Sequence, residues 1–342
     1  MFNWLAKLFG YVMKGCSWIT GGNYILAMLL FAVAMQLLLL PFGYKQQKNM
    51  VKQASIRPKE MAIRNKYKGR NDQVTMKKLQ QEIMDLYQKE GYSQLAGCLP
   101  MLLQLIIIFP IYRVVIRPLE YLFGLSAEKC QEIYTALFGT EANYSKDSIA
   151  QFNIISELTG SNGAEAWGKL AAELNNNVDL QGAITAQGGI DALPNMTLFG
   201  QNLGVTPISA FGQSYWWLIF IPIINLGLMY LSQFLTKKMS YQNPQAQEMN
   251  NSSMKIMMYV LPLMTMFITF SFAAGIGIYW IFRTLLSMLQ QFIFYKTMPY
   301  PQFTEEDYKK AERDLKGGSK SKKDTNYVVA PGEYRSLHHI DD

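Results

Sequence analysis

Five long apolar runs constrain what this chain can fold into more than any other feature. They cover about residues 24–42, 99–115, 215–235, 256–272 and 276–294. A helix of roughly 20 apolar residues spans the hydrocarbon core of a bilayer. One such run occurs as the core helix of a soluble protein, but five runs in 342 residues predict an integral membrane protein. The charged share of 17% agrees with this, since about 25% is usual for soluble domains.

Lysine and arginine are distributed unevenly between the loops, and this predicts the orientation of the chain. Residues 43–94 hold 12 Lys and Arg against 5 Asp and Glu, whereas residues 119–213 hold 3 against 10. Positive charge concentrates in cytoplasmic loops. We therefore expect 43–94 inside, 119–213 outside, the N-terminus outside and the C-terminus in the cytoplasm. The net charge of +7 then describes a polarity across the membrane and does not indicate a nucleic-acid binder.

The expected fold class is an all-α integral membrane protein, with a five-transmembrane-helix core, a cytoplasmic helical hairpin and an extracytoplasmic insertion. The expected segments are an amphipathic interfacial helix (1–23), a first span (24–42), the hairpin (43–94), a second span (95–118), the insertion (119–213), a third span (214–235), a cytoplasmic loop (236–254), a fourth span (255–273), a fifth span (274–297) and a flexible cytoplasmic tail (298–342). The first 20 residues fit equally a helix in the outer headgroup layer and a helix packed on the bundle. Within the insertion, 126–138 and 163–175 have the pattern of short amphipathic helices.

The last apolar run carries a polar stripe. Arg283, Ser287, Gln290 and Gln291 recur at i, i+4, i+7 and i+8, which puts them on one helical face. An arginine inside a lipid-spanning helix costs at least about 2.5 kcal/mol, so it needs a wet or paired environment. Two interpretations follow: the stripe lines a functional site, or Arg283 pairs with a carbonyl or amide inside the bundle.

Two other glutamines interrupt the apolar runs. Gln36 is the one strongly polar group of the first run, whose inner end is marked by Pro41, and Gln104 lies in the cytoplasmic part of the second. A buried glutamine commonly makes a hydrogen bond between helices. Gln36 fits either that role or a place in a functional site.

Residues 43–94 have the composition of a helical hairpin with a turn at 68–72 and with Pro58 interrupting the outgoing helix. The return helix places four apolar residues on one side: Met76, Leu79, Ile83 and Leu86. The hairpin fits either a solvated arm or a basic arm that docks on an acidic or RNA-rich partner or on the inner leaflet. The docking residues would be the basic side chains near the turn: Lys66, Lys68, Arg70, Lys77 and Lys78.

Several kinds of chemistry find no support in the sequence. The cysteines are Cys16, Cys98 and Cys130, and the histidines, His338 and His339, stand in the tail. This pattern predicts neither a metal site nor Ser-His or Cys-His nucleophilic machinery. No phosphate-binding loop and no acidic residue within a span are present, so we expect neither an ATP cycle nor a carboxylate proton relay. The sequence predicts a passive membrane device that is not an enzyme and uses no cofactor. Cys16 and Cys130 fit either a pair or free thiols.

Three stretches outside the insertion and the tail carry recognisable motifs: 95–100 (LAGCLP, with Gln104 behind it), 81–87 (QEIMDLY, after Lys66-Tyr67) and 274–280 (AGIGIYW, followed by 285–287 and 290–291). They resemble, in that order, the second core span, the first cytoplasmic region and the fifth core span of the YidC-type membrane protein insertases, the Oxa/YidC/Alb superfamily. The resemblance implies five core helices around a hydrophilic groove that opens to the cytoplasm and to lipid and is closed on the outer side.

The resemblance also implies a function. Members of this family insert small membrane proteins and help them fold in the bacterial plasma membrane, alone or beside the Sec translocon. Nascent membrane proteins, the Sec translocon, the ribosome and the lipid bilayer are the implied partners, and no specific nucleic-acid sequence is. A small-solute transporter or channel, or a scaffold that recruits a cytoplasmic partner, are the alternative functions that the residues leave open.

One position departs from the family pattern. The family commonly carries an arginine five residues before the proline that ends the first core span, and here that position is Gln36, five before Pro41. Arg283 stands in the fifth span, where the family often has an uncharged amide. We hypothesise that the positive charge of the groove has moved from the first span to the fifth. The groove residues would be Gln36, Gln104, Arg283, Ser287, Gln290 and Gln291.

Overall fold

The computed structural model describes residues 3–70, 72–92, 107, 109–139, 141, 143–147, 149–159, 163–174, 182, 193, 196–239 and 259–316. The described chain is almost entirely helical. In order, its elements are α1 (Asn3–Ile19), α2 (Tyr24–Lys66), α3 (Gln73–Lys89), η1 (Leu119–Phe123), α5 (Ala127–Phe138), α6 (Ala150–Thr159), α7 (Gly163–Leu174), β1 (Thr197–Leu198), β2 (Gln201–Asn202), η3 (Pro207–Ala210), η4 (Trp216–Ile219), α9 (Phe220–Met239), α12 (Leu261–Ser271), α13 (Ala274–Thr297) and α14 (Glu305–Lys316). Residues 109–116 are also helical.

The contacts divide the chain into two units. The first holds the described residues of Met1–Leu39, Gln104–Phe234 and Asn250–Leu289. The second holds those of Leu40–Leu103, Leu235–Met249 and Gln290–Asp342. Each unit is described by itself below.

Two helices among the described residues are long and apolar enough to cross a bilayer. They are Tyr24–Lys66 and Trp216–Met239, and Pro262–Ser271 forms a shorter apolar helix. The described helices are therefore compatible with a membrane protein. Most of the second expected span, and the start of the fourth, lie outside the described residues.

Helix α2 differs from expectation because it runs without a break through Pro41 and Pro58. A proline inside a helix removes one backbone hydrogen bond, and the sequence therefore predicted an interruption at Pro58. Pro58 is buried, and the neighbouring Ile56 and Ile63 belong to an apolar cluster with α3. Packing of this face offsets the lost hydrogen bond, since most helical stability in proteins comes from tertiary burial.

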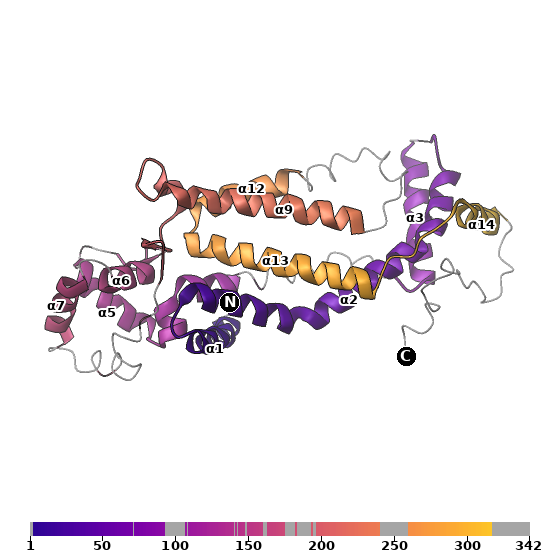
Figure 1. Ribbon diagram of the computed structural model, residues 1–342. Helices are drawn as coiled ribbons and strands as arrows, with labels where there is room; N and C mark the ends of the chain where they lie inside the picture. Colours follow the sequence, from indigo (N-terminus) through magenta and orange to yellow (C-terminus); the bar gives the residue numbers. More distant parts are fainter. Residues whose placement is uncertain are drawn as a thin grey trace. The chain divides into compact units, whose positions relative to one another are not determined.

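In the first unit, α9, α12 and α13 lie alongside one another (Figure 1). Asn225 of α9 is 3% exposed, and its Nδ2 donates to the Gly277 carbonyl of α13 at 2.9 Å. Gly277 leaves little room, because a Cβ there would meet Ile221 at 2.5 Å. A small residue thus lets α9 and α13 approach closely, and the buried amide links them.

The region between the second and third expected spans forms a helical cluster of α5, α6 and α7 (Figure 1). The helices predicted over 126–138 and 163–175 correspond to α5 and α7. Ser126 accepts a hydrogen bond from the Lys129 amide and caps the start of α5. Helix α6 and the strand pair β1–β2 were not anticipated.

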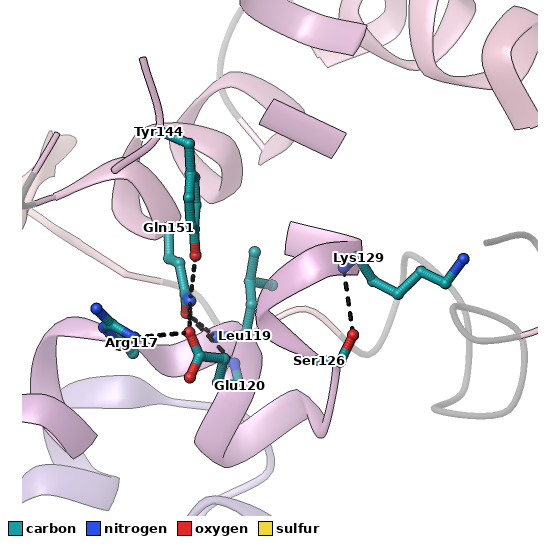
Figure 2. A network of polar contacts seen from close by, with 7 residues as sticks. All are labelled: Arg117, Leu119, Glu120, Ser126, Lys129, Tyr144 and Gln151. Carbon is teal, nitrogen blue, oxygen red and sulfur yellow. Dashed lines mark hydrogen bonds and ion pairs between the residues drawn. The ribbon is translucent and has the colours of Figure 1, made fainter. Parts of the chain in front are cut away.

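Figure 2 shows a polar network that joins η1 to α6. Gln151 of α6 is 2% exposed, and its Oε1 accepts from the backbone amides of Leu119 and Glu120 at 2.9 and 3.3 Å. Its Nε2 donates to the Glu120 carboxylate at 2.8 Å and to the Tyr144 hydroxyl at 2.9 Å. Arg117 adds an ion pair to Glu120 at 3.2 Å. One buried side chain therefore satisfies the first amides of η1.

The segment after β2 holds the first residues of α13. The backbone amide of Ala274 donates to the Val205 carbonyl and that of Gly275 to the Leu203 carbonyl, both at 2.9 Å. The ring of Phe152 from α6 lies 3.7 Å from where a Cβ on Gly275 would stand. The first backbone amides of a helix have no hydrogen-bond acceptor within the helix. Here two carbonyls from a segment distant in sequence accept from the first two amides of α13.

Helix α1 uses its two faces differently. One face is buried and contacts η1, where a Cβ on Gly10 would meet Tyr121 at 2.5 Å. The opposite face exposes large apolar residues: Trp4, Leu8, Tyr11 and Trp18. The helix therefore packs on the protein, and its exposed face carries aromatic side chains of the kind found at membrane interfaces. Its place in the outer headgroup layer stays a prediction.

The second unit is a helical hairpin closed by a C-terminal helix. The end of α2 and α3 pack around a cluster of Ile56, Ile63, Leu79, Ile83, Tyr87 and Tyr92. The predicted apolar side of α3 was wrong at one end, because Met76 is exposed and Tyr87 takes a buried place instead.

The expectation of a flexible tail from residue 298 was also wrong for its first part. Residues Glu305–Lys316 form α14, Leu315 packs against the hairpin cluster, and Asn65 donates to Glu312 at 2.8 Å. The rest of the tail, from 317, lies outside the described residues.

Candidate functional site

The polar stripe of α13 lies on the less exposed face of its helix. Arg283, Ser287, Gln290 and Gln291 are all partly buried. The opposite face carries exposed apolar residues: Leu285, Leu289, Phe292 and Ile293. This is the reverse of a helix in water, where charged residues take the solvated face. The arrangement suits a helix whose exposed face meets lipid and whose polar groups turn toward the protein.

The contacts between α2 and α13 fix how their residues correspond. A Cβ on Gly43 would overlap the side-chain amide of Gln290, so these residues touch within the second unit. In the first unit, the rings of Phe31 and Tyr279 have centroids 6.0 Å apart. In the second unit Gln47, beyond Gly43, donates to the Met298 carbonyl, beyond Gln290, at 3.3 Å, so the two helices run parallel there.

The ring contact puts Gln36 and Arg283 at nearly the same level within the first unit. Gln36 stands five residues after Phe31, and Arg283 stands four residues after Tyr279. At about 1.5 Å per residue, the two polar residues lie at nearly the same distance beyond the contact between the rings. The polar groups of the first and last apolar runs are thus brought to nearly one level along the two helices.

The stripe residues have partners within the protein. Gln291 accepts a hydrogen bond from the Thr236 hydroxyl of α9 at 2.8 Å. Gln36, Arg283 and Gln290 each make a further polar or electrostatic interaction. Thr236 and Gly43 were not predicted as site residues from the sequence. Gly43 follows Gln36 at i+7, a spacing that indicates a shared helical face.

Other predicted positions cannot be located. Gln104, the motif 95–100 with Cys98, most of the loop 236–254, and both histidines lie outside the described residues. Among the described cysteines, Cys16 and Cys130 are free and buried, which favours the free-thiol interpretation. Burial raises the pKa of the Cys130 thiol, so it stays protonated and unreactive at neutral pH. Within the described part of the chain, no group of three or more His, Cys, Asp or Glu could hold a metal ion.

Of the five basic residues predicted to dock, Lys66 forms an ion pair, and all five are exposed. The Lys66 ammonium donates to the Glu82 carboxylate at 2.6 Å, and the Tyr67 hydroxyl donates to the same carboxylate at 2.7 Å. These hydrogen bonds outweigh burial, which acts the other way, and lower the pKa of Glu82. The other four exposed residues are Lys68, Arg70, Lys77 and Lys78.

Comparison with known proteins gives a consistent result. The family described as "60Kd inner membrane protein" matches residues 16–302. Over 113 residues, 33% of this chain, the sequence is 38% identical to the membrane protein insertase MisCA of Bacillus subtilis (strain 168), covering 41% of that protein. It is 40% identical over 29% of its length to the membrane protein insertase YidC 2 of Bacillus anthracis, covering 39% of that protein.

A longer match extends over 86% of the chain at 24% identity, to the membrane protein insertase YidC of Pelodictyon phaeoclathratiforme, of which it covers 38%. The chain thus matches less than half of the length of each of these relatives.

Proposed function

The chain belongs to the 60Kd inner membrane protein family, and from this premise we propose that it inserts small or Sec-delivered membrane proteins into the bacterial inner membrane and helps them fold. The observation that carries the proposal is the partly buried polar stripe of α13, with Arg283 at nearly the level of Gln36. Placing a cation and several amides on the protein-facing side of a lipid-spanning helix costs free energy of insertion. A functional role for these groups would explain why they are there.

The proposed topology follows the charge distribution of the loops. The five apolar runs cross the membrane, with 43–94, 236–254 and the C-terminus in the cytoplasm and with the N-terminus and 119–213 outside. The excess of Lys and Arg in 43–94 and of Asp and Glu in 119–213 supports this orientation.

The proposed mechanism is passive and not enzymatic. Water around the stripe lowers the cost of drawing a short hydrophilic segment partway into the bilayer. Arg283 attracts acidic side chains of that segment, while glutamines exchange hydrogen bonds with its backbone. The groove glutamines would be Gln36, Gln104, Gln290 and Gln291, with Ser287 beside them. Apolar parts of the substrate then move into lipid, and at about 25 cal/mol per Å² of buried apolar surface this can drive insertion without ATP.

The hairpin is proposed as a docking arm for delivery. Lys66 forms an ion pair with Glu82. The residues proposed to contact an acidic or RNA-rich partner are therefore the other exposed ones, Lys68, Arg70, Lys77 and Lys78. A ribosome or the Sec translocon are the proposed partners of this kind.

A liposome assay tests the proposed function. The purified full chain is reconstituted, and integration of a single-span protein with an acidic tail is measured by protease protection. We expect integration by the wild type and its loss in Arg283→Glu. Lys296→Glu, a charge reversal at an exposed position of the same helix, serves as the matched control and should retain activity.

Two variants separate a groove cation from a structural one. Arg283→Ala should slow insertion of acidic-tailed substrates more than of neutral-tailed ones, because the attraction is electrostatic. Insertion at the wild-type rate in Arg283→Ala, together with loss in Gln36→Ala, would refute the relocated charge. Flux of a small solute without insertion would instead indicate a transporter, and neither activity would indicate a scaffold.

A further inference from the structure

The turn between β1 and β2 has an unusual residue at its tip. The strands pair antiparallel with Leu198 opposite Gln201, so Phe199 and Gly200 form a two-residue connection. Both have positive φ, +49° and +77°, which is the pattern of a type I′ turn. Asn or Asp is the usual residue before the glycine of such a turn, and a bulky side chain there is a genuine outlier. Phenylalanine therefore stands where the backbone disfavours it.

Packing inside the protein does not explain this choice. The Phe199 side chain is 83% exposed, and its ring contacts that of Trp217, whose centroid lies 5.4 Å away. A strained backbone position that is retained without burial points to a role outside the folded protein.

The surroundings identify what Phe199 meets. Trp216 and Phe220 are exposed and in ring contact at 5.7 Å, so the aromatic residues continue onto the start of α9. From there to Phe234 the exposed large side chains of α9 are apolar: Ile223, Ile224, Leu231 and Phe234. In a membrane protein that face of a long apolar helix borders lipid, and aromatic residues gather where such a helix leaves the hydrocarbon.

The sequence of this segment also fits lipid. No charged residue occurs between Asp191 and Lys237, so the uncharged stretch begins well before α9 does. A protein partner recognised in water would leave a polar rim on this surface. A neutral stretch with exposed aromatic side chains matches the headgroup and upper acyl region of a bilayer.

We propose that the β1–β2 turn is a membrane anchor, in which Phe199 enters the outer leaflet and holds the segment that binds the start of α13. The connection to α13 is short, because Leu203, close behind β2, accepts the Gly275 amide at 2.9 Å. The anchor would fix the outer end of the helix that carries Arg283. This proposal rests on the topology of the proposed function.

Photocrosslinking identifies the occupant. A benzophenone amino acid replaces Phe199 in the full chain, expressed in cells whose lipids carry a clickable acyl chain. We expect a lipid adduct at 199 and at Phe220, which serves as the positive control, and none at Gln131, an exposed position of α5. A protein adduct at 199, or no lipid adduct, would overturn the proposal.

A substitution separates anchoring from turn stability. Phe199→Asn introduces the residue that the turn prefers, so thermal stability in detergent should be equal or higher. Insertion in vesicles of phosphatidylethanolamine and phosphatidylglycerol should nevertheless fall severalfold, while Phe199→Trp keeps wild-type activity. Lower stability of Phe199→Asn, or its unchanged insertion rate, would contradict the anchor.

The two proposals fail differently. If the wild type inserts no substrate in vesicles, the proposed function is refuted. If position 199 also gives no lipid adduct, the anchor and the topology on which it rests are refuted as well. If the wild type inserts substrate but 199 gives no lipid adduct, the anchor alone is refuted.

Discussion

The α-carbon of Gly43 in α2 lies against the side-chain amide of Gln290 in α13, so closely that any side chain at position 43 would overlap it. Gly43 stands mid-helix, where glycine is unfavourable by about 0.5–1 kcal/mol relative to alanine. A position that keeps glycine at this cost is one where helix approach outweighs helix propensity.

Gly43→Ala should therefore lower thermal stability by about 1–3 kcal/mol, because the added methyl group displaces Gln290 or the nearby Phe294. Gly227→Ala is the matched control, since Gly227 is also mid-helix but has open space around a built Cβ. It should be neutral or stabilising. Differential scanning fluorimetry in detergent measures both, and adding Gln290→Ala to Gly43→Ala should recover most of the loss. Equal behaviour of the two glycines would contradict the close approach.

Asn225→Leu should destabilise the first unit. The substitution removes the donor to the Gly277 carbonyl of α13 and to the Ile221 carbonyl of α9. Hydrogen bonds between membrane helices average about 0.6 kcal/mol, with values up to about 1.7, so we expect a loss in that range. Thermal unfolding in detergent measures it, and an unchanged midpoint would show that the amide is dispensable.

Gln151→Leu should loosen the cluster outside the spans. Leu119 and Glu120 would lose the acceptor of their amides in a buried place, which costs about 1–3 kcal/mol. Limited proteolysis of 119–174 should then become faster than in the wild type. Gln131→Leu, on an exposed part of α5, should leave cleavage unchanged. If both variants are cleaved alike, the network does not hold η1.

The hairpin should lose stability at both ends of the pH range. The pKa of Glu82 is lowered from its ordinary 4.5, so its contribution is present above that value and is lost as pH falls through the lower folded pKa. The hydrogen bond from Lys66 to Glu82 raises the pKa of Lys66 above 10.5, so its contribution is lost as pH rises through the higher folded value.

Hydrogen exchange of α3 as a function of pH tests this, after correction for the intrinsic exchange rate. Protection in the wild type should decline below about pH 4.5. In Glu82→Gln the acid-side decline should be absent, because the group no longer titrates. Identical acid profiles for the two proteins would assign the loss to other carboxylates.

Local patterns in the sequence were sufficient for several features. The spacing of Arg283, Ser287 and Gln290 indicated a shared helical face, and the amphipathic pattern of 126–138 indicated α5. Both depend on residues close in sequence, so periodicity rules reach them. Family motifs then supplied the basis of the proposed function, which periodicity alone does not specify.

Features that depend on distant contacts could not be predicted. The passage of α2 through Pro58 depends on burial against α3, and the docking of α14 depends on Leu315 packing against a cluster formed by residues between Ile56 and Tyr92, far earlier in the chain. The strand pair β1–β2 was not predicted because Phe199 is not a residue that usually forms turns. In each case tertiary packing overrides the local preference.

The two carbonyls that hold the start of α13 have a mechanical consequence. A helix tethered at one end by paired bonds to a separate segment cannot turn about its long axis without breaking them. The hydrogen bonds from Ala274 and Gly275 to Val205 and Leu203 therefore prevent rotation of α13 about its long axis. They fix the orientation of the helix face that carries Arg283 two turns further along, so under the proposed function a substrate segment would meet the guanidinium from one side only.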